Sequence, residues 1–206
     1  GQFVSLMGPT GAPSRIPAAG SSALLIGGGL GNAVLLSIGA EMRKAGVNVT
    51  YIAGYKKAID RYKHQEIENA ADMVVWACEE RALSPSSARD ASVRGNVIDA
   101  IGLLQDQYPS LLANVNEVLI IGSDGMMYAA HRALRYDFAE CFSKPPKVLV
   151  SVNSPMQCMM KEICAQCLQR QVCPETGEER FVYSCATQDQ DADAVDFAGL
   201  RLRLSQ

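Results

Sequence analysis

An apolar segment that runs directly into a glycine-rich turn constrains the fold of this chain more than any other feature. Residues 23–26 read Ala-Leu-Leu-Ile, typical of a short buried strand, and Gly27–Gly31 follow at once. A helical pattern comes next, and Gly46 stands where that helix would end. The apolar residues on one face of this helix are Val34, Leu35, Ile38 and Met42.

Glycines in such a turn let the backbone bend tightly and let a pyrophosphate approach the helix N-terminus. The free N–H groups and the dipole of that terminus favour an anion. Glycines also serve turns and close packing without any ligand. The strand before the turn and the helix after it favour nucleotide binding over that alternative.

The glycine spacing departs from the usual dinucleotide fingerprint, because it is G-x-G-x-G and not G-x-G-x-x-G. A second predicted strand, 47–52, is followed by Lys56 and Lys57, where an ordinary Rossmann domain has an acidic residue for the ribose 2′-hydroxyl. The pattern therefore indicates a relative of the Rossmann domain. The lysines, with Arg61 and Lys63 beyond them, suggest a modest preference for NADPH, whose 2′-phosphate attracts cations. The alternative is that these cations only solvate a helix face.

Strand-like and helix-like segments alternate along most of the chain. Such alternation predicts an α/β fold in which a five-stranded parallel sheet carries helices on both faces. The expected strands are 23–26, 47–52, 73–77, 117–121 and 147–152. The expected helices are about 32–45, 56–70, 95–106 and 125–141. Residues 83–92 are predicted to form a loop, and the acidic stretch 189–193 a solvated turn.

Composition excludes several classes of function. The chain of 206 residues is 48% hydrophobic and 20% charged, which is typical of a globular protein. A formal net charge of −3 gives no electrostatic reason to expect nucleic acid as a partner. No apolar run reaches the length of a membrane span, and no secretory signal is visible. We therefore expect a cytoplasmic location, where thiols remain reduced.

Crowded cysteines near the C-terminus are the second informative feature. The spacing C-x5-C-x2-C is one residue longer than the C-x4-C-x2-C of plant-type 2Fe–2S proteins, which add a distant fourth cysteine. Four cysteines also hold structural zinc, and disulfides are a third possibility. A thiol–disulfide oxidoreductase using the two cysteines of the C-x2-C pair is a further alternative, but the strand order does not suggest a thioredoxin-like scaffold. The crowded cysteines are Cys158, Cys164, Cys167, Cys173 and Cys185.

The segments between the last cysteines indicate which four could act together. Residues 180–184 have the pattern of a strand that returns the chain toward the others, whereas 173–177 have the pattern of a hairpin turn. The predicted metal ligands are therefore Cys158, Cys164, Cys167 and Cys185.

Several motifs in order along the chain resemble those of one known group, the ferredoxin–NADP reductase superfamily. Within it, the chain looks like the iron–sulfur electron-transfer subunit of dihydroorotate dehydrogenase and related sulfhydrogenase and glutamate-synthase-like subunits. Two positions differ, because Gly122 and Asp124 stand where the family has Cys and Pro, so any thiol role beside the nicotinamide is lost. The motifs are Gly8–Gly11, Leu24–Gly31, Val74–Glu80, Gly95–Asp99, Gly122–Met127 and Met156–Cys158.

The resemblance implies three regions and a function. Residues 1–19 would end a missing flavin-binding barrel, 20–153 would form a ferredoxin-reductase-type NAD(P)-binding domain, and 154–206 a small Cys-rich 2Fe–2S subdomain. The chain would be the C-terminal fragment of an NAD(P)H-dependent oxidoreductase, inactive alone, that passes electrons between NAD(P)H, FAD on the missing part, and the cluster. The cluster would exchange electrons with a partner subunit or domain.

The resemblance also implies which residues contact the nucleotide, and no side chain is required as a catalytic acid or base. A non-enzymatic nucleotide-binding module with structural zinc is the alternative function. The implied cofactor-binding residues are Gly27, Gly28, Gly29, Gly31, Lys56, Lys57, Gly122, Ser123, Asp124 and Met127.

Overall fold

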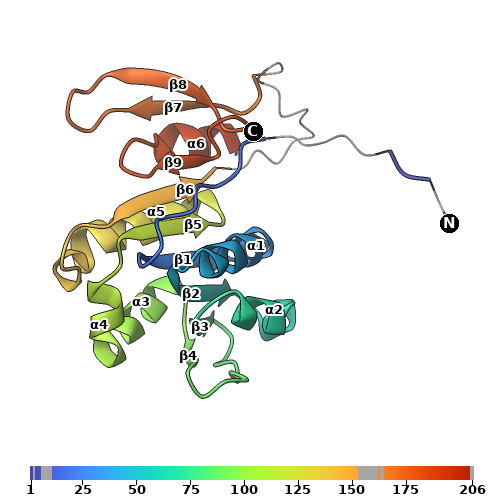
Figure 1. Ribbon diagram of the computed structural model, residues 1–206. Coiled ribbons are helices and arrows are strands. Elements are labelled where there is room, and N and C mark those ends of the chain that lie inside the picture. The colour runs from blue at the N-terminus through green and yellow to red at the C-terminus, as the bar shows by residue number, and fades with distance from the viewer. Residues whose placement is uncertain (2, 6–10, 153–161, 163–164, 205–206) are drawn as a thin grey trace.

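A seven-stranded, mostly parallel sheet organises the chain (Figure 1). The computed structural model describes residues 1, 3–5, 11–152, 162 and 165–204. The strand order is β4-β3-β2-β1-β5-β6-β9, and all neighbours are parallel except β6 and β9. The strands are β1 (Ser22–Gly28), β2 (Asn48–Tyr55), β3 (Met73–Cys78), β4 (Ala91–Arg94), β5 (Glu117–Ile121), β6 (Lys147–Ser151) and β9 (Asp189–Asp191).

Helices cover both faces of this sheet, which confirms the predicted α/β architecture (Figure 1). The α-helices are α1 (Gly31–Lys44), α2 (His64–Asn69), α3 (Val97–Gln107), α4 (Pro109–Ala113), α5 (Asp124–Arg132) and α6 (Phe197–Leu204). Shorter helical turns are η1 (Ala58–Asp60), η2 (Ala133–Asp137) and η3 (Ala139–Cys141).

The alternation of side chains along β1 creates two cores. Leu24 and Ile26 pack with Ile101 of α3, on the face that α4, α5 and α6 also cover. Leu25 points to the other face and packs with Leu35 of α1, in a core that α2 completes through Ile67. The central strands are buried on both faces, which explains why they read as continuous apolar segments.

The sheet has seven strands, and the expectation of five was wrong. β4 lies within and just beyond the predicted loop 83–92, as a four-residue edge strand that pairs only with β3. β9 replaces the predicted acidic turn at 189–193 and pairs with β6. Its charged side chains flank Gln190, which is buried and accepts a hydrogen bond from Gln171. Short strands of this kind are held by tertiary pairing and carry little pattern of their own.

Two predicted helices are also interrupted. The helix expected at 56–70 is the turn η1 followed by α2, and Lys63 between them has a left-handed backbone with φ of 50°. The helix expected at 125–141 begins as α5 and then changes to the π-helical η2 and the 3₁₀ turn η3.

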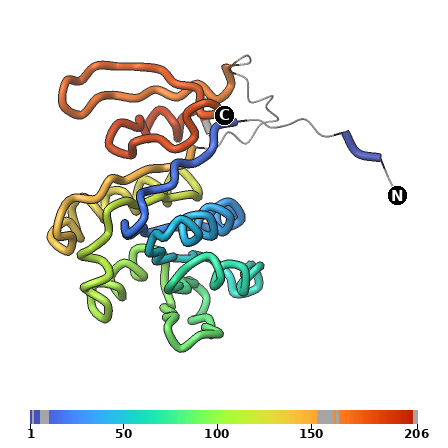
Figure 2. Tube along the Cα trace, viewed as in Figure 1, coloured from blue at the N-terminus to red at the C-terminus, as the bar shows by residue number. Residues whose placement is uncertain are grey.

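The C-terminal segment contributes to two sheets. β7 (Leu168–Val172) and β8 (Glu179–Tyr183) form an antiparallel hairpin, while β9 joins the edge of the large sheet beside β6 (Figure 2). Phe197 and Leu200 of α6 pack into the core that α3 and α5 share. Across the described ranges, no helix is both long and apolar enough to cross a bilayer.

Candidate functional site

The glycine turn after β1 is held by a buried asparagine. Asn32, at the start of α1, has no exposed surface, and its Nδ2 donates to the carbonyls of Gly29 at 3.1 Å and Gly54 at 3.4 Å. Its Oδ1 accepts a hydrogen bond from Tyr51 at 3.0 Å. A Cβ at Gly27 would lie 1.9 Å from this oxygen, so only glycine leaves room for the asparagine. Asn32 thereby ties the turn after β1 to the end of β2.

Further glycines bring the turn after β1 against the turn after β5. A Cβ at Gly31 would lie 2.2 Å from the carbonyl oxygen of Ile121. Met126 of α5 fills the space between Gly28 and Gly122, because a Cβ on either glycine would lie 2.2 or 2.5 Å from its side chain. A cysteine at position 122, as in the family, would therefore require the end of the Met126 side chain to move.

The start of α1 offers backbone donors beside this junction. The N–H groups of Asn32 and Ala33 donate to the carbonyls of Gly29 and Leu30. Within the described part of the chain, this leaves the N–H groups of Leu30 and Gly31 without a carbonyl partner. Such donors at the N-terminus of a 14-residue helix favour an anion. They border a cavity of about 350 Å³ that is also lined by Gly28, Gly122 and Ser123.

An adjoining cavity of about 350 Å³ opens where β1, β2 and β3 end. It shares Gly28 and Ser123 with the first, so we treat the two as one pocket and call it the nucleotide pocket after the prediction made from the sequence. Asn96 is fixed at its rim by a capping box, in which its Oδ1 accepts from the Ile98 N–H at 2.7 Å. The adjoining cavity is lined by Gly28, Gly29, Gly54, Tyr55, Lys56, Asp60, Glu79, Asn96, Val97, Ser123 and Met126.

The nucleotide pocket gathers most of the residues predicted to bind the cofactor. Gly28, Gly29, Gly31, Lys56, Gly122 and Ser123 line it, and Gly27 lies directly beneath the turn. Ser123 also begins α5, and its Oγ accepts from the Met126 N–H at 3.3 Å.

The other three predicted residues do not line this pocket. Lys57 is exposed beside it. Met127 is buried in the core. The carboxylate of Asp124 accepts a hydrogen bond from Arg201 at 3.2 Å.

Two of the four basic residues expected to attract a 2′-phosphate interact with other groups of the protein. The guanidinium of Arg61 lies 5.2 Å from the ring centre of Trp76 and donates to the carbonyl of Ser84. Lys63 forms an ion pair with Glu66 at 2.6 Å. Of the four basic residues considered from the sequence, Lys56 is the one that lines the pocket.

Aromatic side chains pack together around the carboxyl end of β2. Tyr55 is 4% exposed and stacks on Trp76, with a ring-centre distance of 6.4 Å. Burial raises the pKa of Tyr55, so its hydroxyl remains protonated at neutral pH. That buried hydroxyl lies near Asn32 and makes no hydrogen bond of standard geometry with the described residues. The hydroxyl of Tyr62 lies 3.4 Å from the carbonyls of Gly29 and Leu30 and closes the turn from outside.

Two of the four predicted metal ligands lie at one end of the hairpin. The carbonyl of Cys167 accepts from the N–H of Ser184 at 3.1 Å and from its Oγ at 3.2 Å. Cys185 is the next residue, so the two cysteines stand on facing chains at the open end of β7 and β8. The side chain of Cys167 is buried. Cys158 and Cys164 lie outside the described residues.

Cys173 lies at the opposite end of the same hairpin. Its N–H donates to the carbonyl of Glu178 in the closing turn. The whole length of β7, five residues or roughly 17 Å, separates it from Cys167. Hydrogen bonds, first from the side chain of Thr176, lower the pKa of Cys173.

From the open end of the hairpin, the chain runs to the carboxyl ends of the parallel strands, where the nucleotide pocket also lies. Asp189 of β9 pairs with Ser151, and Gln188 accepts a hydrogen bond from the N–H of Val152. Both contacts are at the carboxyl end of β6, and the glycine turn is at the carboxyl end of β1. Because β6 is two strands from β1, these ends are roughly 10 Å apart across the sheet.

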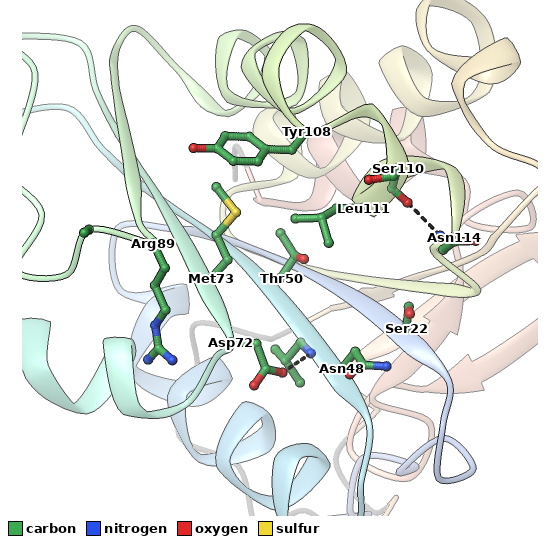
Figure 3. A pocket seen from close by; sticks show the side chains of 12 residues that line it. Ser22, Asn48, Thr50, Asp72, Met73, Arg89, Tyr108, Ser110, Leu111 and Asn114 are labelled. Carbon is green, nitrogen blue, oxygen red and sulfur yellow. Dashed lines mark hydrogen bonds between the residues drawn. The ribbon is translucent and has the colours of Figure 1, made fainter.

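A larger cavity of about 550 Å³ opens at the opposite, amino end of β1, β2 and β3 (Figure 3). Tyr108 and Leu111 lie on one side of it and Asp72 on another. Asp72 also forms an ion pair with Arg43. None of the residues predicted to bind a cofactor or metal lines this cavity. The site described above is thus separate from this larger cavity.

Sequence reasoning missed several residues of the pocket. Asn32 and Met126 read as ordinary helix residues, because their roles depend on a close approach between distant loops. Asp60 and Glu79 were not predicted as pocket residues, although Glu79 lies in the motif Val74–Glu80. The signal that could have found them was their place just after β2 and β3, since the carboxyl ends of parallel strands meet at one edge.

Comparisons with known proteins give partial matches. No protein-family model matches the chain. An uncharacterized protein of Rickettsia prowazekii is 38% identical over 65 residues, which are 32% of this chain and 9% of that protein. A probable dihydroorotate dehydrogenase B (NAD(+)) electron transfer subunit of Methanocella arvoryzae is 37% identical over 75 residues, which are 36% of this chain and 28% of that subunit.

One solved structure matches nearly the whole chain. It is the NADH-dependent reduced ferredoxin-NADP oxidoreductase, with a TM-score of 0.72 and 23% identity over 98% of this chain and 63% of that one. This chain therefore spans less than two thirds of each of these proteins. The resemblance that the sequence motifs predicted is confirmed in two respects: the fold is similar to that of this reductase, and a segment of the chain is similar in sequence to the electron transfer subunit.

Proposed function

We propose that this chain is the nucleotide- and cluster-binding part of a flavin-dependent NAD(P)H oxidoreductase. It passes electrons between NAD(P)H, an FAD bound outside residues 1–206, and a 2Fe–2S cluster, which in turn serves a partner subunit or domain. The observation that carries the proposal is the meeting of the turns after β1 and β5 around one pocket, at the edge of the sheet to which the cysteine-bearing hairpin leads.

The residues of the pocket fit a dinucleotide. The N–H groups of Leu30 and Gly31 and the dipole of α1 suit a pyrophosphate, and Gly29 leaves open space above the backbone. Ser123 and Met126 lie on the far side of the same pocket, where they can contact the group that the pyrophosphate carries. The chain's role there is to bind and orient, and no side-chain acid or base is needed.

The open end of the hairpin, with Cys167 and Cys185, fits a cluster better than the turn that carries Cys173. Cys167 and Cys185 stand together, and the segment that holds Cys158 and Cys164 comes between β6 and Cys167 in the sequence. Thiolates are the ligands that iron–sulfur clusters use, and the spacing approaches the plant-type pattern. We therefore assign Cys158, Cys164, Cys167 and Cys185 as ligands and exclude Cys173.

FAD belongs to the proposal because of the chemistry of the two sites. A nicotinamide gives up two electrons as a hydride, whereas an iron–sulfur cluster accepts one at a time, and flavin supplies the conversion when it is bound. Residues 1–19 would link the flavin domain to residues 20–153, and residues 154–206 would hold the cluster. The rival function, a nucleotide-binding module with structural zinc, uses the same cysteines and is distinguished by metal content.

The test is anaerobic reconstitution of the purified chain with iron and sulfide, followed by metal, sulfide and absorption analysis. The proposal expects two irons and two sulfides per chain, with visible absorption, and nucleotide binding in calorimetry. Stoichiometric zinc that resists replacement by iron would contradict the electron-transfer role and favour the rival.

A further inference from the structure

A continuous series of hydrogen bonds runs between the hairpin and β9. The Nε of Arg180 donates to Gln171 Oε1 at 2.8 Å, and Gln171 Nε2 donates to Gln190 Oε1 at 2.8 Å. Gln190 Nε2 then donates to the Oγ of Ser184 at 3.2 Å. That hydroxyl donates to the carbonyl of Cys167, a predicted cluster ligand, at 3.2 Å. We call the side chains of Arg180, Gln171, Gln190 and Ser184 the amide network.

The charge at one end fixes the direction of every bond in the amide network. A guanidinium can only donate, so the oxygen of the Gln171 amide faces Arg180 and its nitrogen faces Gln190. For the same reason the Gln190 nitrogen faces the Ser184 hydroxyl, whose proton is left for the carbonyl of Cys167. The dipoles of the network are therefore aligned, with their positive ends toward Cys167.

Burial of the amide network is not explained by packing alone. Gln171 and Gln190 are each 1% exposed, and Ser184 is 4% exposed. Burying polar side chains costs free energy that their hydrogen bonds largely offset, so well-packed apolar side chains would hold the hairpin against β9 about as well. A role for the polar groups has therefore to be sought at Cys167, where the network ends.

The carbonyl of Cys167 is held by two hydrogen bonds from Ser184. Besides the hydroxyl, the N–H of Ser184 donates to it at 3.1 Å. These bonds fix the peptide group of Cys167, whose side chain is buried beside it. A negative charge at this end of the hairpin would be stabilised by the aligned dipoles and by the guanidinium of Arg180 at their far end.

We propose that the amide network positions Cys167 and raises the midpoint potential of the 2Fe–2S cluster that Cys167 and Cys185 would help to hold. Reduction adds one electron, supplied by the flavin of the proposed function, and with it one negative charge that the network stabilises. Net charge and hydrogen bonds around the ligands are among the factors that set the potential of such clusters. The inference rests on the proposed function and deepens it, because it names the residues that tune the electron acceptor.

The experiment measures the midpoint potential of the anaerobically reconstituted chain by redox titration, followed by paramagnetic resonance of the cluster. Arg180→Met removes the charge at the start of the amide network, and Gln190→Met interrupts the network in its middle. Arg180→Lys is the conservative variant, because it keeps the charge at this exposed position.

Gln169→Met is the matched control for the buried amide. Gln169 is 2% exposed and lies two residues from Cys167, but it bonds to Arg170 and Arg203 and not to the amide network. Denaturant unfolding of each variant without metal shows how much stability the substitution costs.

Arg180→Met and Gln190→Met should each lower the equilibrium constant for reduction about fivefold, or roughly 40 mV for a one-electron couple, as for the loss of one hydrogen bond. Arg180→Lys should recover most of that loss. Gln169→Met should keep the constant within about 1.5-fold of wild type, or roughly 10 mV, even where it lowers stability as much as Gln190→Met does.

A bound cluster with the potential of wild type in both Arg180→Met and Gln190→Met would overturn the inference and leave the proposed function intact. Equal losses of potential in Gln169→Met and Gln190→Met would also overturn it, because loosening of the hairpin would then be the cause. If Gln190→Met does not fold, the two variants of the exposed Arg180 decide. Failure of a folded wild type to assemble a 2Fe–2S cluster would overturn the proposed function and this inference together.

Discussion

Glycines decide how closely the backbones of the nucleotide pocket approach one another. At Gly27 and Gly31 a side chain would collide with Asn32 or with the backbone of Ile121, so these residues serve packing within the protein. Gly29 differs, because a Cβ there would meet nothing within 4 Å, while its φ of +54° is in the left-handed region. The open space above Gly29 leaves room for a phosphate group of a ligand to contact the protein backbone.

Substitution of Gly29 by alanine should weaken nucleotide binding at least about tenfold, or roughly 1.4 kcal/mol. The added methyl group would project into the space that the pyrophosphate uses. The strain of a left-handed alanine, roughly 1 kcal/mol, would also lower stability. Calorimetry with NADH gives the affinity, and denaturant unfolding gives the stability.

Gly20→Ala is the control for this strain. Gly20 also has a left-handed backbone, with φ of +81° and open space around it, but it precedes β1 at the other end of the strand. Its alanine variant should lose similar stability and keep the affinity of wild type. Equal affinities for the two variants would show that Gly29 does not contact the nucleotide.

At the scale of elements, two contacts connect the C-terminal segment with the large sheet. β9 extends the sheet beside β6, and Asp193 just after it bonds to Arg135 of η2 at 2.9 Å and to His131 of α5 at 2.7 Å. Since α5 begins at the nucleotide pocket and β9 follows the cysteine-bearing hairpin, these contacts hold the two predicted binding regions together.

Cysteine substitutions test the assignment made from the hairpin. Cys167→Ser and Cys185→Ser should abolish cluster assembly, because each removes a ligand at the open end of the hairpin. Cys173→Ser should keep the iron content and visible absorption of wild type, since its turn is roughly 17 Å from Cys167. Loss of iron in the Cys173 variant, with retention in the Cys185 variant, would reverse the assignment.

The contact of Asp193 predicts a dependence of stability on pH. Burial acts to raise the pKa of Asp193, but hydrogen bonds from Arg135 and His131 outweigh it and lower the pKa. A lowered carboxyl pKa stabilises the fold above the unfolded value of about 3.9, and this stabilisation is lost as the pH falls through the folded value.

Asp193→Asn should therefore lower the free energy of unfolding by about 1 kcal/mol at pH 7, given that the side chain is one-third exposed. The difference from wild type should shrink as the pH falls below about 4. Denaturant unfolding at both pH values measures it, with the exposed Asp106→Asn as control. A difference that persists unchanged in acid would assign the effect to packing.

At the scale of the whole molecule, the sheet places the two predicted binding regions at the carboxyl ends of its parallel strands. Parallel strands direct the turns after β1 and β5 to the same side, and the antiparallel β9 brings the chain back to that side from the hairpin. The order of the strands, more than any single side chain, sets the distance between the proposed nucleotide site and the cysteines.

The sequence predicted the parts of this arrangement that carry local periodicity. The five central strands, the helices at about 32–45 and 95–106 and the glycine turn were predictable, because burial on two faces leaves long apolar runs and the two helices keep one apolar face. β4 and β9 were not, since a short edge strand is defined by its neighbour. The pocket was predicted in part: Gly28, Lys56 and Ser123 line it, whereas the roles of Asn32 and Met126 depend on contacts between separate loops.

The central claim is that electrons pass between NAD(P)H and a cluster held by this chain. The most direct measurement is anaerobic titration of the protein expressed from its complete gene, with paramagnetic resonance for the cluster and absorption for the flavin. With NADH, wild type should bleach its flavin and develop the signal of a reduced 2Fe–2S cluster, whereas Cys167→Ser should bleach the flavin alone. A wild-type protein that binds NADH but shows neither change, or that lacks flavin and iron, would contradict the account.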